Sequence, residues 1–265
     1  MISFPNAKIN LGLNVIGKRS DGYHDLITVM YPVPLYDVLE FLPSPALELK
    51  LHGKKLEGAL DQNLVFKAYH LLRSEYNLPS VTIHLLKKIP LGSGLGGGSS
   101  DGTFMLKMLV RYFKLPVSKG EMKKMALKIG SDCPFFVENI PALVSGRGDK
   151  IEPLSFSLKG FYLVLLFPDH FISTAKAYDQ IVARPGLTDI KELVLSKDFD
   201  LWRKYLINDF EKLMPEKILA LKNELYSAGA LYASLSGSGS AIYGIFQKKP
   251  EKYFHRADAK VLECI

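Results

Sequence analysis

The feature that most constrains this 265-residue sequence is a glycine-rich segment before its midpoint. Five of the seven residues from Gly92 to Gly98 are glycine, which would severely weaken any regular element. The segment follows a strand-like run and precedes a helix-like run, so its N–H groups and the helix dipole are expected to converge on an anion, most often phosphate. A flexible linker is the alternative, but the segment is short and anchored by Pro90.

Two common nucleotide-binding patterns do not fit this segment. A dinucleotide fingerprint follows the first strand of a doubly wound unit, whereas several expected strands precede residue 92 and no suitable acid ends the next strand. The Walker-type loop needs Gly-Lys-Ser/Thr, which the sequence lacks. The segment is therefore expected to be a different phosphate loop.

Hydrophobic periodicity predicts strands and helices along the whole chain. Strands are expected at 8–16, 26–31, 38–42, 47–51, 81–86, 162–167, 231–235 and 241–246, the last two as a hairpin. Helices are expected from Asp61-Gln62-Asn63 onward and at 99–113, 118–129, 175–182, 201–213 and 215–228. Ser99 and Ser100 are expected to begin their helix, and Gly130 to serve as the C′ residue of another.

Size and composition are those of a globular protein with two lobes. Hydrophobic residues make up 48% and charged residues 23% of the chain. Turn residues cluster near 150–158, which places the expected domains at 1–154 and 155–265. The sequence has no run of about 18 apolar residues, so no membrane span is expected. The N-terminus does not resemble a signal peptide. Two cysteines without paired spacing favour a reducing cytoplasm.

The net charge of +7 allows either a nucleic-acid partner or an enzyme that handles phosphorylated anions. The lysines are dispersed as pairs, such as Lys54-Lys55 and Lys248-Lys249, and do not form one basic run. Such pairs are usually solvated surface, so no nucleic-acid partner is expected.

Three ordered motifs make the chain similar to the GHMP kinases (galactokinase, homoserine kinase, mevalonate kinase, phosphomevalonate kinase). They are Pro5-Asn6-Ala7-Lys8-Ile9-Asn10-Leu11, the segment from Pro90 to Ser100, and Ser236-Gly237-Ser238-Gly239-Ser240. Within that superfamily, Asp21-Gly22-Tyr23-His24 and Gly130-Ser131-Asp132-Cys133-Pro134-Phe135-Phe136 resemble the kinases of 4-diphosphocytidyl-2-C-methyl-D-erythritol. Ser93 and Gly102 stand where that family often has alanine, a small departure.

The resemblance implies an α+β fold, with an N-terminal lobe like the second domain of ribosomal protein S5 and a ferredoxin-like C-terminal lobe. It implies ATP and Mg²⁺ as cofactors, with transfer of the γ-phosphoryl group to the 2-hydroxyl of a cytidine-diphosphate-linked sugar alcohol. The Mg²⁺ ligands and the oligomeric state are left open. The segment implied to bind ATP comprises Pro90, Leu91, Gly92, Ser93, Gly94, Leu95, Gly96, Gly97, Gly98, Ser99 and Ser100.

The resemblance also assigns the catalytic pair. Asp132 is implied as the base that receives the hydroxyl proton, although a turn aspartate is the commoner explanation for such a residue by itself. Lys8 is implied as the cation that keeps Asp132 ionised and attracts the transferring group. Asn10 lies on the same strand face, where it would bind substrate or orient Lys8.

A second set of residues is implied for the substrate. Tyr23, His24 and Tyr178 are expected to enclose the pyrimidine ring, although a core tyrosine and a surface histidine are the ordinary explanations for each singly. Gly237, Ser238 and Gly239 are expected to form a second loop at the site, with a plain hairpin turn as the alternative.

Two rival functions are a GHMP kinase of the mevalonate or homoserine type and a non-catalytic RNA-binding protein.

Overall fold

The computed structural model describes residues 1–53, 60–169, 173–183, 189–253 and 255–264. The chain forms two compact units and passes between them several times. The first unit comprises residues 1–7, 35–91 and 96–139, and the second comprises residues 8–34, 92–95 and 140–265. The expected domain limits at 1–154 and 155–265 stay a prediction.

The first unit is built on a four-stranded sheet with the order β1-β4-β6-β5. β6 (Val81–Lys87) is antiparallel to β4 (Val38–Pro43) and parallel to β5 (Glu48–Gly53), while β1 (Ile2–Ser3) pairs with the far side of β4. Every second residue of β6 is buried, which is the pattern of a strand with one face on a core.

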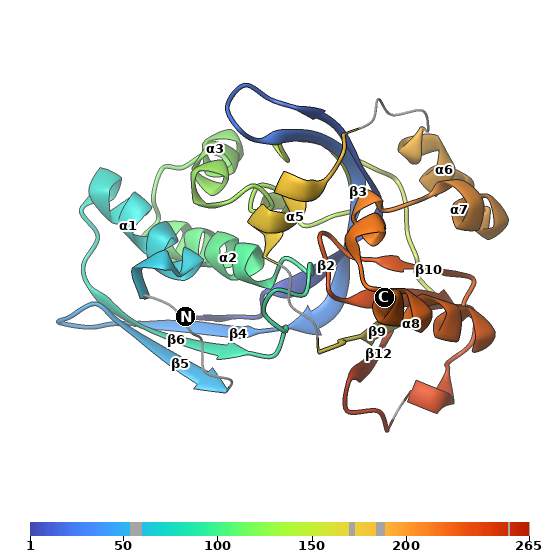
Figure 1. The fold of residues 1–265 in the computed structure, drawn as a ribbon. Helices are drawn as coiled ribbons and strands as arrows, with labels where there is room; N and C mark the ends of the chain where they lie inside the picture. Colours follow the sequence, from blue (N-terminus) through green and yellow to red (C-terminus); the bar gives the residue numbers. More distant parts are fainter. Residues whose placement is uncertain (54–59, 170–172, 184–188, 254, 265) are drawn as a thin grey trace. The chain divides into compact units, whose positions relative to one another are not determined.

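Helices cover one face of this sheet and enclose the core of the first unit. α1 (Leu64–Tyr76) and α2 (Gly97–Tyr112) lie side by side along the sheet (Figure 1). Two further helices, α3 (Lys119–Ile129) and the short α4 (Phe135–Glu138), pack beside them. The buried side chains of α1 recur at helical spacing: Val65, Ala68, Tyr69 and Leu72. Asn63 caps α1 by accepting a hydrogen bond from Val65 N at 3.0 Å.

The second unit holds two four-stranded sheets, ordered β2-β3-β7-β8 and β10-β11-β9-β12. The strands of the first are β2 (Asn6–Lys18), β3 (His24–Tyr36), β7 (Ala142–Gly146) and β8 (Lys150–Pro153). Those of the second are β9 (Tyr162–Leu166), β10 (Tyr232–Leu235), β11 (Ile242–Phe246) and β12 (Ala259–Glu263). β9, β10, β11 and β12 pair antiparallel throughout, and β10 and β11 form the expected hairpin.

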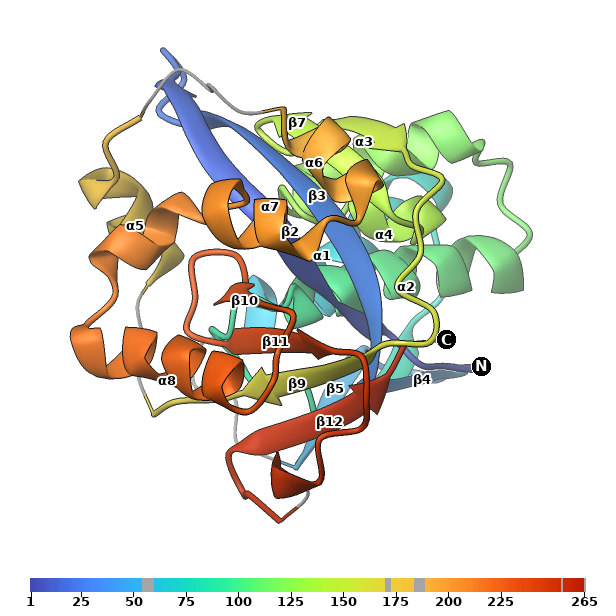
Figure 2. The same ribbon diagram turned by 90° about the vertical axis from the view of Figure 1, so that its right-hand side faces the viewer.

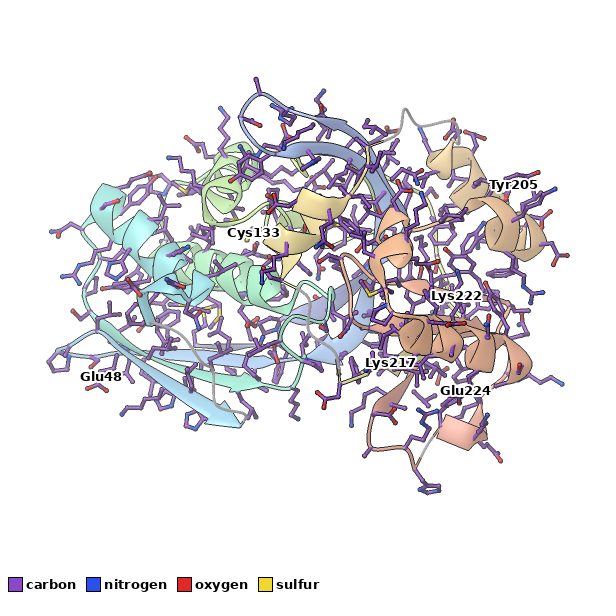
Figure 3. All side chains as sticks on the ribbon, in the orientation of Figure 1. Glu48, Cys133, Tyr205, Lys217, Lys222 and Glu224 are labelled. Carbon is purple, nitrogen blue, oxygen red and sulfur yellow. The ribbon has the colours of Figure 1, made fainter. Side chains whose placement is uncertain are left out.

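The helices of the second unit are short apart from the last. They are α5 (Thr174–Gln180), α6 (Ile190–Ser196), α7 (Phe199–Tyr205) and α8 (Glu216–Ser227). α8 packs on β10 and β11 (Figure 2) and buries Ile218 and Leu225. Its outer side is held by ion pairs: Lys222, labelled in Figure 3, donates to Glu211 at 2.8 Å, and Glu224 accepts from Arg256 at 2.7 Å.

Most expected elements are confirmed, with ends that differ by a few residues, and three expectations are wrong. α2 begins at Gly97 instead of Ser99, because Gly96 takes a left-handed conformation (φ 69°) as its N-cap. Gly130 ends α3 as an extended C-cap (φ −175°) and not as a left-handed C′ residue. The expected helix at 201–213 is broken after α7, because the Asn208 side chain bonds to Leu235 O and Gly237 O.

Four strands and two α-helices of the described residues were not expected from the sequence. They are β1, β7, β8, β12, α4 and α6. Each is seven residues long or shorter, and β8 lies where turn residues suggested a boundary. Elements this short carry too little periodicity to be distinguished from loops.

Among the described residues, no helix is long and apolar enough to cross a membrane.

Candidate active site

Residues 92–95 lie against the loop that joins β10 to β11, and both segments belong to the second unit. Ser240 N donates a hydrogen bond to Gly92 O at 3.2 Å, and Ser236 Oγ donates to Gly94 O at 3.0 Å. The first half of the glycine segment is therefore anchored by main-chain and hydroxyl contacts. It does not behave as a free linker.

Two glycines in these segments meet backbone to backbone. A Cβ on Gly94, whose φ is 76°, would lie 1.9 Å from Ser236 O, and a Cβ on Gly237, whose φ is 56°, would lie 2.9 Å from Gly94 O. Any side chain at Gly94 would collide with main chain and also take up an unfavourable conformation. Ser238 and Gly239 continue the second loop, and both Ser238 and Ser240 are buried.

Lys8 lies inside the second unit, although a lone lysine early in a strand is normally exposed. Only 2% of its surface is exposed, and its Nζ donates to Asn10 Oδ1 at 2.6 Å and to Gly94 O at 2.8 Å. Its backbone N donates to Leu95 O at 2.9 Å. Asn10 is held in turn, because its Nδ2 donates to Thr28 Oγ1 at 3.1 Å. A buried ammonium is thus joined to the glycine segment within the same unit.

The second half of the glycine segment forms the start of α2 in the first unit. The N-cap Gly96 supplies no side-chain cap, so the first N–H groups of this helix need partners from elsewhere. Ser99 and Ser100 lie in its first turns and do not cap it. Ser100 Oγ is fully buried and has no hydrogen-bond partner among the described residues. An uncapped helix start beside an unsatisfied buried hydroxyl is suited to bind an anion.

Asp132 lies in the turn between α3 and α4 and is half-buried. Thr103 of α2 fixes this turn to the helix, because its Oγ1 bonds to both Ser99 O and Cys133 O at 2.9 Å. The Cys133 side chain is buried in the core of this unit, and burial raises the pKa of its thiol to about 12, so it stays a neutral thiol. Asp132 belongs to the first unit and Lys8 to the second, so their catalytic pairing stays a prediction.

Two of the three expected base-binding residues lie together in the second unit. The rings of His24 and Tyr178 are 5.3 Å apart with an interplanar angle of 32°, and Tyr178 also meets the edge of Phe210 at 4.9 Å. Tyr23 is 48% exposed and lies under the guanidinium of Arg147, which is 4.1 Å from the ring centre. Sequence reasoning missed Arg147, because nothing local links residue 147 to residue 23.

The least expected feature of this region is a buried charge cluster in the first unit. Lys87 Nζ is bonded to Asp37 Oδ2 and, at 2.6 Å, to Asp101 Oδ2. The other oxygen of Asp37 accepts from the backbone N of Lys88 and, at 2.9 Å, from that of Ile89. Asp37 stands in an apolar run, and Asp101 stands in a helix. Neither local pattern indicates that the two carboxylates meet.

Two carboxylates share this single ammonium in the interior. Burial raises the pKa of Asp101 to about 7, and the attraction of Lys87 only partly offsets that effect. Burial lowers the pKa of Lys87, but the two carboxylates leave it above its usual value, so the ammonium stays charged. Asp101 Oδ1 is buried and has no hydrogen-bond partner among the described residues.

Comparison with known proteins places this chain among kinases. Residues 63–139 match the model of the GHMP kinases N terminal domain, and residues 190–260 match that of the GHMP kinases C terminal domain. The chain is 47% identical over 256 residues to the 4-diphosphocytidyl-2-C-methyl-D-erythritol kinase of Azobacteroides pseudotrichonymphae, covering 94% of each chain. It is 45% identical to the Bacteroides fragilis protein of the same name, covering 100% of this chain and 98% of that one.

Solved structures agree in fold. A crystal structure of 4-(cytidine 5'-diphospho)-2C-methyl-D-erythritol kinase is 30% identical, with a TM-score of 0.76 over 92% of this chain and 90% of that one. The mevalonate kinase of Methanococcus jannaschii has a TM-score of 0.70 at 15% identity, over 100% of this chain and 97% of that one, which shows a shared fold only. The expected α+β fold of the GHMP kinases is confirmed.

The close approach at Gly94 predicts a strong effect of a single methyl group. Gly94→Ala should lower the free energy of unfolding by roughly 2–4 kcal/mol through collision and strain, and should weaken ATP binding. Gly120→Ala is the matched control, because Gly120 lies in α3 and a methyl group there would have nothing within 4 Å. Chemical denaturation and equilibrium ATP binding check both variants; equal behaviour would contradict the proposed packing.

The raised pKa of Asp101 predicts a pH-dependent stability. The folded chain keeps a proton on Asp101 up to about pH 7, whereas the unfolded chain loses it near the ordinary value of 3.8. The free energy of unfolding should therefore fall between these values as pH rises. Asp101→Asn removes this effect, so its stability relative to wild type should increase from pH 5 to pH 8 by on the order of 2 kcal/mol. Urea denaturation of both proteins at pH 5 and at pH 8 measures this. If the stability difference between Asp101→Asn and wild type were the same at the two pH values, the prediction would be refuted.

Proposed function

The chain belongs to the GHMP kinases, in the family of 4-diphosphocytidyl-2-C-methyl-D-erythritol kinases, and we propose that it phosphorylates the 2-hydroxyl of that alcohol with ATP. The observation that carries the proposal is the 44–47% identity, over 92% or more of each chain, to relatives with this name from several bacteria. The reaction is a step of non-mevalonate isoprenoid precursor biosynthesis. We expect the protein to act in the cytoplasm.

The nucleotide is proposed to bind through main-chain amides. GHMP kinases use ATP, and this chain supplies Gly92 to Gly98 together with the uncapped start of α2. The unsatisfied Ser100 Oγ and the bare backbone at Gly94 support this assignment, because both fit a ligand that approaches closely. Pro90 and Leu91 lead into the segment, and Leu91 is 53% exposed.

Mg²⁺ is proposed to accompany the nucleotide. The described residues hold no group of three His, Cys, Asp or Glu side chains suited to a metal, but Mg²⁺ in kinases is bound largely by phosphates and water. Ser100 Oγ is a hydroxyl that fits such a partner, because it has no hydrogen-bond partner among the described residues. When bound, the ion would neutralise charge on the phosphates.

The chemical step needs a base for the alcohol and a cation for the phosphoryl group. We assign the first role to Asp132, which would accept the proton of the 2-hydroxyl as the hydroxyl oxygen attacks the γ-phosphorus, while the bond from the γ-phosphorus to the bridging oxygen breaks and ADP leaves. We assign the second to Lys8, whose ammonium is already positioned by Asn10 Oδ1 and Gly94 O. Because those contacts fix the ammonium before substrate binds, little reorganisation is needed during the reaction.

The cytidyl group is proposed to bind in the second unit. His24 and Tyr178 present neighbouring rings, and Tyr23 adds an exposed aromatic surface backed by Arg147. Aromatic rings bind a pyrimidine by stacking, and the buried histidine can supply a hydrogen bond to the base. The loop Gly237-Ser238-Gly239 is proposed to contact the substrate through its amides.

The substrate assignment is tested by comparing alcohols. The purified protein with ATP and Mg²⁺ should phosphorylate 4-diphosphocytidyl-2-C-methyl-D-erythritol with a kcat/KM at least ~10³-fold above those for mevalonate and homoserine, because both lack the base. Coupled measurement of ADP release gives the three values, and phosphorus NMR locates the new ester. Preferential use of mevalonate or homoserine would overturn the assignment.

The catalytic assignment predicts a loss of turnover without a loss of ATP affinity. Asp132→Asn and Lys8→Met should each lower kcat by about 10²–10⁴-fold, since a base and a charge-stabilising cation act mainly in the transition state. Equilibrium binding of ATP should change by less than about threefold in either variant. Near-normal turnover of both variants would show that the roles are misassigned.

A further inference from the structure

Asp37 is fully buried, and it accepts hydrogen bonds from three donors at the end of β6 and just beyond it, besides lying against Asp101. Its Oδ2 accepts from Lys87 Nζ, and its Oδ1 accepts from the backbone N of Lys88 and of Ile89. Its own backbone N donates to Pro5 O at 2.9 Å. The carboxylate therefore organises three consecutive residues just before the glycine segment. A buried carboxylate with this many donors is costly to remove and stays in one place.

Lys87 extends this link to the other side of the glycine segment. Its Nζ also bonds to Asp101 Oδ2 at 2.6 Å, and Asp101 lies in the second turn of α2. One buried ammonium thus connects the strand that enters the segment to the helix that leaves it. Both contacts lie within the first unit.

The start of α2 is also packed directly on these residues. A Cβ on Gly97 would lie 2.8 Å from Ile89 Cγ2 and 3.2 Å from Lys87 Nζ, so only glycine permits this approach. The ammonium and the first turn of the helix are therefore neighbours. A shift of Lys87 would move the backbone whose N–H groups we assign to the phosphates.

The first turn of α2 is made partly of residues that form helices poorly. It contains Gly97 and Gly98, and each glycine weakens a helix by about 1 kcal/mol relative to alanine. No side chain caps the turn, and Gly96 begins it in a left-handed conformation. The buried network offsets this weakness, because it orders the turn before any ligand binds.

We propose that Asp37 is a positioning residue for ATP: through Lys87 and Asp101 it keeps the first turn of α2 aligned for the phosphates. The inference rests on the proposed nucleotide site and adds to it a residue that touches no substrate. Without the link, the first turn of α2 would become ordered only when ATP binds. Part of the binding free energy would then be used to order the turn, and KM for ATP would rise. The phosphoryl transfer step and the alcohol site should be little changed, since Asp37 contacts neither Lys8 nor Asp132 in the described contacts.

Asp37→Asn tests this link. The amide keeps the size of the side chain and one acceptor, but its NH₂ group would face the Lys87 ammonium, so the connection is cut. KM for ATP should rise about tenfold, while kcat at saturating ATP and KM for the alcohol stay within about threefold. The matched control is Asp209→Asn, since Asp209 is also buried and accepts from a backbone N and a lysine, Val15 N and Lys212 Nζ. That control should lose stability without changing KM for ATP.

Asp101→Leu is a second test of the link, and its result does not depend on whether Asp37→Asn folds. It leaves Lys87 and Asp37 as a balanced pair in the interior, so the fold should be kept. At pH 8, where Asp101 is ionised, removing its negative charge near bound phosphates would by itself tighten binding, whereas cutting the link should weaken it. The dissociation constant of the ATP analogue AMPPNP, measured by calorimetry, should rise at least about threefold. An unchanged or tighter constant would overturn the positioning role.

The two proposals fail in different ways in these measurements. Unchanged AMPPNP binding by Asp37→Asn and Asp101→Leu, beside normal binding by the wild type, refutes the positioning role alone. Wild-type binding of AMPPNP without phosphoryl transfer to the cytidyl alcohol refutes the substrate assignment alone. A raised KM for ATP in Asp209→Asn equal to that in Asp37→Asn would show that lost stability, not the link, is the cause.

Discussion

The buried ammonium of Lys87 is the interaction on which the first unit depends around the glycine segment. It is the only described cation bonded to both Asp37 and Asp101. Without it, two carboxylates would face each other in an apolar interior, which is among the most costly arrangements in a folded protein. The strand before the segment and the helix after it are thereby placed together before the nucleotide arrives.

The second unit fixes the first half of the segment by close backbone packing together with two side-chain donors. Gly94 and Gly237 approach so closely that neither can carry a side chain, and Ser236 Oγ and Lys8 Nζ both donate to Gly94 O. The carbonyl of Gly94 thus accepts two hydrogen bonds from side chains of the same unit. The glycines thus have a defined packing role here, beyond providing flexibility.

The sequence predicted the long, periodic elements well, and it was less successful where side chains act at a distance. The alternation of β2 and β6 and the helical spacing of α1 indicated these elements directly. The break after α7 depends on Asn208, whose side chain donates to Leu235 O at the end of β10 and to Gly237 O in the β10–β11 loop, 27 and 29 residues further along. No local pattern contains such a contact. The start of α2 at Gly97 was missed because serine usually begins a helix, whereas here a left-handed glycine does.

The sequence by itself determined the family, because its motifs lie in contiguous stretches whose chemistry can be read residue by residue. It also predicted a phosphate loop at 92–98, since five glycines in seven residues suit little else between a strand and a helix. Only the tertiary structure decided that Lys8 is buried against Asn10 and Gly94, and that Asp37, Lys87 and Asp101 share one site. The reason is physical: burial and charge pairing arise between residues separated by as many as 86 positions, and only folding brings them within bonding distance.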